Sequence, residues 1–570
     1  MYILFSLILG LVFVGMTYSK DEYLVSIVGG SFMFLFWSMI NYFALPTLGW
    51  GYHGVFFEIF LTLVVAVVVR NIVEYEWHPV AWIAVSFALL WLVFSIASSE
   101  MCNSHRYQQM IDVEEVSYKN FAEDINVIPV DKMIVADYDL ACKVAEDKLE
   151  EDPGLGSRCD VGRMTLQNLT GSFVINNGVK LEFNNDLIWV APLEHSGFWR
   201  WVKLDVTPGY VIVYANDPTK RYLVTEINGE SLKMKYLESG CFADDIERHI
   251  RTNGYLSSGL TEHNFEIDPN GRPYWVLCNY EPTIGIFGGN DSKGVITVDI
   301  QSGDVKQYAL DETPLWIDHI QPEHFVNNQL RCWGMYKKGW WNGCFVGEDV
   351  VVPTPGMVLV YSEGESYWYT GVSASKLEGN TATSGFVLIN ARTKEAKYYK
   401  VSGVNEMEAK RIAEDQNFAK AAQYHATSPV LYNVKGMPTY FMTFKGSSGN
   451  VTGYAFVSVT NRQAVGVGTS KKEAESNYLK SLRRTGNDSI EDGPQVAVDV
   501  KTYTIRDITL EGTTYYVLFN EVKGKEFTGS SEFFRELKWT KPNDKVNVSY
   551  SEGSSQLILL DSFDNLNFEF

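Results

Sequence analysis

The sequence predicts an α+β protein in which four transmembrane helices precede tandem antiparallel α+β units and a small C-terminal β-barrel. Charge is the first observation: residues 1–98 hold only seven charged side chains, net −3, whereas residues 99–570 carry −18 of the total of −21. Four apolar runs within residues 1–98 are the second. The third is a series of short β-branched and aromatic runs, separated by turn residues, beyond residue 164.

The four apolar runs cover residues 2–18, 23–45, 55–69 and 80–97. A span needs about 20 mostly apolar residues, so the second and fourth are long enough and the other two are short. A cleaved signal peptide is the alternative for the first run, but that run lacks a basic front end and a small-residue cleavage site. Four spans place both termini on one side of the bilayer.

Glu58 is the one ionisable residue inside these runs. A carboxylate in a membrane is costly and by default indicates a functional group, for which His53 or Asn41 would be the partner. The alternative is that Glu58, about one turn from the start of its run, reaches the interface.

The soluble region begins with residues 99–163, which we interpret as a helical connector. Within it, Ala141, Val144, Ala145 and Leu149 have helical spacing and predict an amphipathic helix over 135–149.

Residues 164–482 are predicted to form the tandem α+β units because one hairpin pattern recurs. The segments 294–308 and 385–399 both start with Gly, have Asp or Asn five residues later and end with Tyr. We interpret each as two strands joined by a tight turn that the Asp or Asn side chain caps. Helices are predicted over 405–423, capped by Asn405, and from Ser470 to Leu482, opened by a capping box.

A polar linker at 483–495 separates these units from residues 496–570. The short strand-like runs of this last segment, with no helical pattern among them, predict a barrel of OB or SH3 type.

Two clusters are candidate sites. Asp318, His319, Glu323 and His324 place two carboxylates and two histidines within seven residues, which suits an acid/base or metal site but has no known catalytic spacing. Hydrogen-bonded structural histidines are the alternative.

The second cluster lies in residues 331–345, and its members are Trp333, Trp340, Trp341, Lys337 and Lys338. Aromatic and basic side chains together predict a docking surface for another subunit or for the lipid interface. The alternative is that the tryptophans belong to the core.

Several aromatic and glycine-rich motifs resemble a family of uncharacterised bacterial and phage membrane proteins, some labelled colicin V production protein or phage cell-shape protein. The motifs are Pro192–Gly197, Pro208–Val213, Ile267–Trp275, Thr283–Gly289, Trp316–His319 and Pro438–Met442. The resemblance covers most of residues 130–560 and implies no catalytic residues. The repeated hairpin units also resemble PepSY modules, which implies a binding or inhibitory domain and, for the soluble part, a place outside the cytoplasmic membrane.

From these patterns we expect a membrane-anchored, homo-oligomeric scaffold or assembly protein that is not an enzyme and holds no cofactor or metal. A channel or transporter subunit, with the soluble region as vestibule or gate, is the alternative, and an enzyme of unknown class is a third. The negative charge disfavours a nucleic-acid partner. Seven cysteines without CxxC spacing favour a reducing compartment, so we expect an inner-membrane protein with a cytoplasmic soluble part, although the PepSY resemblance argues for the other side.

Overall fold

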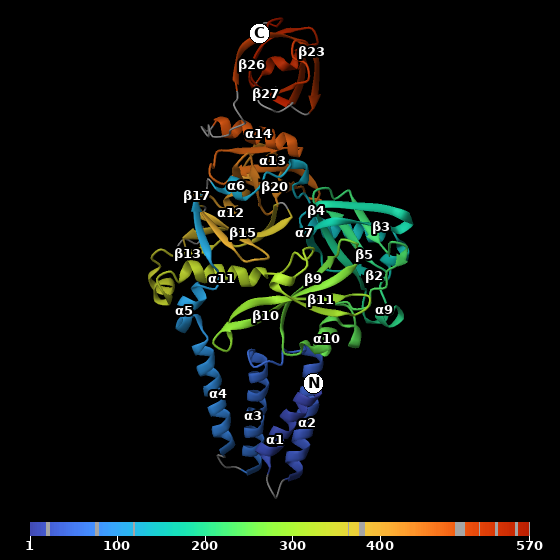
Figure 1. Cartoon of the computed structure of the whole chain (residues 1–570), viewed down its shortest axis with the longest axis vertical. Coiled ribbons are helices and arrows are strands. Elements are labelled where there is room, and N and C mark those ends of the chain that lie inside the picture. Colours follow the sequence, from blue (N-terminus) through green and yellow to red (C-terminus); the bar gives the residue numbers. More distant parts are fainter. Residues whose placement is uncertain are drawn as a thin grey trace.

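The structure is a computed structural model of the 570-residue chain. It describes residues 1–18, 23–74, 79–117, 120–362, 364–374, 382–484, 496–511, 514–530, 534–552 and 557–568. Figure 1 shows an elongated molecule with the N-terminal helices at one end, the sheets in the middle and the C-terminal barrel at the other end.

The N-terminal helices are α1 (Tyr2–Thr17), α2 (Tyr23–Ala44), α3 (His53–Glu74) and α4 (Pro79–Ala97). Three of the four predicted spans are confirmed as helices long and apolar enough to cross a membrane, and α1, with 16 residues, is shorter. The third run extends beyond its predicted limits at both ends, to 22 residues. Large apolar side chains such as Leu35, Trp82 and Leu92 are exposed on these helices, as lipid contact requires.

The connector departs from the prediction. Its elements are α5 (Glu100–Gln108), β1 (Val113–Ser117), α6 (Phe121–Asp124), η2 (Val130–Lys132), α7 (Tyr138–Glu150) and α8 (Pro153–Gly156). The amphipathic helix is confirmed as α7, which Asp137 caps by accepting from the Leu140 amide. The segment 113–117 was expected to be helical or irregular. It is instead a strand, because it pairs in parallel with β17, which lies far away along the chain. Local sequence carries no signal for such a partner.

Two sheets form the first half of the soluble region. A seven-stranded sheet contains β2 (Cys159–Val161), β3 (Thr165–Ile175), β4 (Val179–His195), β5 (Tyr210–Tyr214), β6 (Arg221–Val224), β7 (Glu226–Ile227) and β8 (Glu230–Ser231). A four-stranded sheet follows, in the order β12-β11-β10-β9, with bounds β9 (Gly259–Ile267), β10 (Pro273–Ile284), β11 (Gly288–Asp299) and β12 (Val305–Ala309). Short helical elements join these strands: η3 (Asn176–Gly178), α9 (Phe198–Lys203), η4 (Phe242–Asp244), α10 (Ile246–Ile250) and η5 (Arg251–Tyr255).

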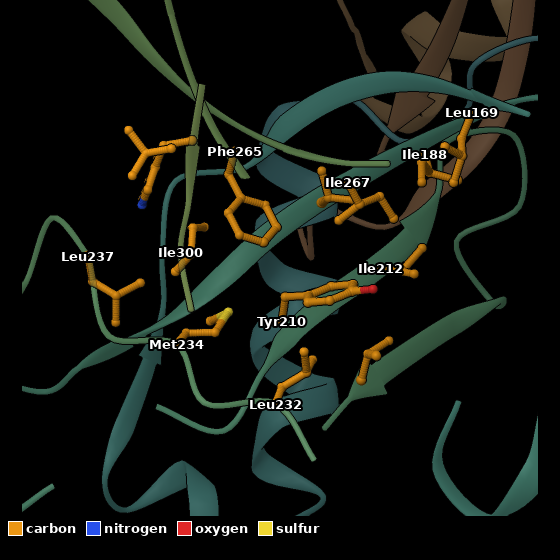
Figure 2. Packing of buried hydrophobic residues seen from close by; sticks show 14 of the residues in the cluster. Leu169, Ile188, Tyr210, Ile212, Leu232, Met234, Leu237, Phe265, Ile267 and Ile300 are labelled. Atoms are coloured by element: carbon orange, nitrogen blue, oxygen red, sulfur yellow. The ribbon is translucent and has the colours of Figure 1, made fainter. Parts of the chain in front are cut away.

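One hydrophobic core joins these two sheets. Figure 2 shows Tyr210 and Ile212 of the first sheet beside Phe265 and Ile267 of the second. Tyr210 is fully buried, and its hydroxyl donates to the Gly271 carbonyl at 2.7 Å, so the polar end of the ring keeps a partner.

Two further sheets follow. The six-stranded one includes β1 and contains β13 (Val351–Pro353), β14 (Val358–Ser362), β15 (Glu365–Ala374), β16 (Ala382–Asn390) and β17 (Ala396–Val404). The five-stranded one contains β18 (His425–Ala426), β19 (Val430–Val434), β20 (Met437–Lys445), β21 (Val451–Ser458) and β22 (Val465–Gly468). The helical elements around them are η6 (Leu310–Glu312), α11 (Glu323–Met335), η7 (Asn342–Val346), α12 (Glu406–Glu414), α13 (Asn417–Ala422) and α14 (Lys471–Arg484).

The two predicted hairpins are confirmed as β11–β12 and β16–β17. Asp299 caps the first turn by accepting from the amides of residues 301 and 302, and Asn390 does the same for residues 392 and 393. Gly303 has a φ of +78°, a left-handed conformation that glycine adopts without strain.

The helix predictions hold with one correction. Asn405 caps α12 as predicted, by accepting from the Glu408 amide, but the single helix expected over 405–423 is two helices because Gln416 is extended. Ser470 accepts from the Glu473 amide, and Glu473 accepts in return from Thr469. Helix α14 continues to Arg484, two residues past its predicted end, and residues 485–495 of the predicted linker lie outside the described residues.

The C-terminal segment closes into a five-stranded barrel in the order β23-β24-β25-β27-β26. Its strands are β23 (Val496–Glu511), β24 (Thr514–Phe519), β25 (Glu526–Ser530), β26 (Lys545–Glu552) and β27 (Leu557–Asn565), with the short helix η8 (Arg535–Lys538) before β26. The pair β25–β27 is parallel and closes the ring. The sequence did not predict β25.

The β10–β11 hairpin fixes the soluble region to the helix ends. Phe287, at the hairpin tip, stacks on His53 at 4.2 Å and meets the edge of Phe56 at 4.9 Å, both at the start of α3. The Leu48 amide between α2 and α3 donates to the Leu256 carbonyl at 2.9 Å. The soluble region therefore has a defined orientation on the helices.

Candidate functional site

A cavity of about 550 Å³ lies where all four sheets meet. Its apolar walls include Trp189 from β4, Leu359 and Trp368 from the six-stranded sheet, and Met442 from β20. Its polar lining consists of Asp137, Tyr138, Asp139, Arg163, Thr165, Glu262, Asn264, His319, Glu323, Thr427, Ser428 and Thr443. A small-molecule site is usually mainly apolar with a few polar groups, and this cavity is more polar than that.

The structure divides the predicted cluster of 318–324. His319 and Glu323 line the cavity. Asp318 is buried and accepts from the Asn168 amide at 2.6 Å, whereas His324 is exposed and its Nδ1 lies 3.3 Å from Glu262. The four side chains therefore do not converge on one reacting point.

Glu266, which sequence reasoning missed, organises this region. It is fully buried on β9 and accepts from the Asp318 amide at 3.1 Å, while its other oxygen lies 3.0 Å from Nδ1 of His319. The side-chain hydrogen bonds described for Glu266 are thus all with the loop that carries Asp318 and His319. This arrangement shapes a loop and holds His319 at the cavity wall.

Burial and charge shift the pKa values of this group. Burial, together with the negative charge of Glu266, raises the pKa of Asp318 well above its ordinary value. Burial lowers the pKa of His319, but its hydrogen bond to Glu266 and the nearby charges of Glu266 and Asp318 outweigh burial and raise it. The hydrogen bond from the Asn168 amide and the charges of His319 and Arg392 oppose this rise in the pKa of Asp318.

These shifts predict a pH dependence. Because the pKa of Asp318 is raised on folding, the folded state binds the extra proton and stability falls as pH rises through the interval between the two pKa values. Asp318→Asn keeps an acceptor for the Asn168 amide and removes the charge. We expect the stability advantage of the variant over the parent to be larger at pH 8 than at pH 5, by about 1–3 kcal/mol, because pH 5 lies nearer the lower end of that interval. Thermal unfolding in detergent at both pH values tests this, and an equal difference at both would contradict it.

A metal site needs several ligands that converge on one point. Among the residues that the structure describes, no group of three or more His, Cys, Asp or Glu side chains is arranged to hold a metal ion. The carboxylates and the histidine at the cavity wall are suited to positioning a polar or cationic group by hydrogen bonds.

Of the two partners predicted for Glu58, the structure places Asn41 in contact with it and His53 elsewhere. Glu58 is 4% exposed and accepts from Nδ2 of Asn41 at 3.1 Å, and the same amide donates to Ser6 on α1. His53, the other predicted partner, instead accepts from Nε1 of Trp91 at 3.1 Å and stacks on Phe287. Glu58 therefore links α1, α2 and α3 through Asn41, and its side chain faces the interior of the helix bundle.

The tryptophan cluster separates into core and surface. Trp333 is buried against Tyr398, as its core alternative predicted, and Lys337 lies 4.1 Å above its ring while pairing with Glu115. Trp340 is half-buried. Trp341 is 67% exposed and remains a candidate for docking. Lys338 pairs with Glu348 and Asp349 and so contributes little net charge to the surface.

The walls of the cavity could not be predicted from sequence. Trp189, Glu262 and Trp368 come from three sheets and are joined by no motif, so only the tertiary fold brings them to His319. The one available signal was the density of polar residues in 316–324.

Comparison of the chain with protein-family profiles and with curated protein sequences gave no match. The fold and the site together define a protein with apolar N-terminal helices suited to membrane anchoring and a large β-rich soluble region.

Proposed function

We propose that this chain is a membrane-anchored assembly protein whose copies associate through the exposed aromatic surface of η7, and that it is not an enzyme. The observation that carries the proposal is a patch formed by Trp341, Phe345 and Val346, of which the first two are 67% and 63% exposed. Their rings lie 4.6 Å apart and form one continuous apolar surface. Exposed aromatic surface of this kind is enriched at protein interfaces.

The patch is held rigidly, which favours binding. Asn342 donates to the Glu348 carbonyl at 2.8 Å and accepts from the Glu348 amide at 3.2 Å, so the loop is closed on itself. Gly347 follows with a φ of +72° and turns the chain back. A preorganised surface loses little conformational entropy when it is covered.

A second copy is the occupant that we propose. The helices confine every copy to one plane in the same orientation, which raises the effective concentration of one patch for another. Lys338, Glu348 and Asp349 together carry only one net negative charge, so two identical patches meet with little charge repulsion.

The test is a double substitution, Trp341→Ser with Phe345→Ser. We expect it to convert the oligomer to the monomer in mild detergent, because Trp and Phe anchors typically contribute about 2 kcal/mol or more each at an interface. Leu315→Ser is the matched control, since Leu315 is an isolated apolar side chain that is 89% exposed. Mass measurement by light scattering distinguishes the two, and an unchanged oligomer in the double variant would contradict the role of this surface.

The cytoplasmic location of the soluble region stays a prediction, which the seven unpaired cysteines support. Labelling of the exposed Cys102 and Cys344 by a membrane-impermeant maleimide in intact cells would contradict it.

We also propose that the barrel is of the OB type, which its five strands and short helix η8 support.

A further inference from the structure

We propose that α9 and Phe242 form a second membrane contact, by which the soluble region rests on the headgroup layer of the bilayer that the helices span. The partner that this surface fits is a lipid surface containing anionic headgroups. The inference is independent of the oligomer proposed above, because it concerns a different surface.

The surface is unusually apolar for an exposed helix. Trp199 is 77% exposed, Val202 is 53% exposed and Phe198 is 48% exposed, all within the six residues of α9. Phe242 is 54% exposed and its ring lies 5.6 Å from that of Trp201, so the apolar surface continues from α9 onto the next loop. We call these five side chains the α9 patch.

Direct contacts connect the α9 patch to the end of a membrane helix. Arg248 donates to the Phe242 carbonyl at 2.6 Å and to the Tyr42 carbonyl at 2.9 Å. Its guanidinium also lies 4.3 Å from the centre of the Tyr42 ring. Since Tyr42 belongs to the last turn of α2, one arginine bridges the membrane helix and the patch.

Figure 1 shows the same relation, with α9 and α10 on the side of the soluble region that faces the helices. Trp50, 71% exposed between α2 and α3, marks the level of the interface, because tryptophan is enriched where hydrocarbon meets headgroups. The α9 patch therefore lies in the half of the soluble region that is nearer the helices (Figure 1).

The backbone at Phe242 carries strain. Its φ is +55°, a left-handed conformation that a bulky residue rarely adopts. The native fold keeps this ring exposed at an energetic cost, which points to a function for the exposed ring.

The basic side chains of α9 favour an anionic lipid surface as the partner. The exposed basic side chains of the patch, Arg200 and Lys203, are on α9, and Asp205 is the one acid of the segment 198–205. The segment after Phe242 adds Asp244, Asp245 and Glu247, which are buried or half-buried, so the basic surface is that of α9 alone. Aromatic rings beside basic side chains suit the headgroup layer, where Lys and Arg are attracted to anionic lipid.

The test uses the full chain labelled with 5-fluorotryptophan in nanodiscs of phosphatidylcholine and phosphatidylglycerol. The ¹⁹F signal of Trp199 is assigned as the one that Trp199→Phe removes. A lipid with a gadolinium chelate on its headgroup is then added. We expect the Trp199 signal to broaden beyond detection, as that of Trp50 does, and the signal of Trp539 on the distal barrel to persist.

Each outcome decides the proposal. A Trp199 signal that persists like that of Trp539 overturns it, whether solvent, a second copy or another protein covers α9. Equal broadening of the Trp199 signal in nanodiscs of phosphatidylcholine alone overturns the preference for anionic lipid. Restoration of the signal by Arg200→Gln with Lys203→Gln supports that preference.

Discussion

Replacing Arg251 by Ala is expected to destabilise the joint, the contact between the helices and the soluble region, by about 3 kcal/mol. The reason is that the substitution removes a buried guanidinium that donates hydrogen bonds to several groups. Arg251 is 4% exposed and donates to the carbonyls of Tyr255 and Ser258, at 3.1 and 2.6 Å, and to Oγ1 of Thr47 at 3.1 Å. Thr47 lies between α2 and α3, so the guanidinium crosses the joint. Its loss leaves two carbonyls and one hydroxyl without this donor.

Hydrogen exchange of the detergent-solubilised protein measures this effect locally. The Leu48 amide bonds across the joint to Leu256, so its exchange should become about a hundredfold faster in Arg251→Ala, the equivalent of the expected loss. Arg535→Ala, at an exposed arginine of the barrel, is the control and should stay within about 0.5 kcal/mol of the parent. Unchanged protection at Leu48 in Arg251→Ala would show that the arginine does not hold the joint.

Replacing Glu266 by Leu is expected to cost about 3 kcal/mol of stability, because the variant leaves buried donors of the Asp318–His319 loop without an acceptor. Those donors are the amides of residues 318 and 319 and Nδ1 of His319. Glu266→Gln keeps one acceptor oxygen, so we expect it to lose about half as much. In both variants the repulsion between the Glu266 and Asp318 carboxylates also disappears, which offsets part of the loss of stability.

Thermal unfolding of the three proteins tests the structural role of Glu266. Glu262→Gln is the matched control, since Glu262 lies on the same strand, is partly exposed and pairs with the exposed His324 rather than hydrogen-bonding to the Asp318–His319 loop. We expect a change within about 0.5 kcal/mol for it. If Glu266→Leu unfolds like the parent, Glu266 is not a structural group, and the catalytic alternative for this cluster regains support.

Local patterns in the sequence predicted much of the fold. The apolar runs became helices α1–α4, and the turn residues Asp299 and Asn390 cap the hairpins for which they were singled out. Hydrophobic periodicity and capping depend on neighbours a few residues apart, which sequence shows directly. Strand β1 was missed because its parallel partner β17 lies almost 300 residues away.

Site prediction succeeded where one short segment carried the signal and failed where the fold assembled it. Asn41 was named as a partner of Glu58, and the contact exists. His53 was named as well, but the hairpin tip with Phe287 occupies it, and nothing near His53 in sequence indicates that hairpin. The α9 patch was missed for a related reason, because α9 has no sequence relation to Tyr42.

Glu58 is the residue at which the alternative of a channel or transporter subunit is tested, by ion or proton flux in Glu58→Gln. Its carboxylate is engaged by Asn41 between helices of a single chain, the environment of a helix-packing contact. The resemblance to bacterial and phage membrane proteins, and to PepSY modules, stays a prediction.

The mass of the unmodified chain in a lipid nanodisc tests the central claim most directly. The chain has a mass of 64.5 kDa, and the account predicts that, after subtraction of the scaffold protein of the disc, the protein mass is a whole-number multiple of this value, two or more. A particle that holds one copy at every protein concentration tested would contradict an assembly protein that associates through Trp341 and Phe345.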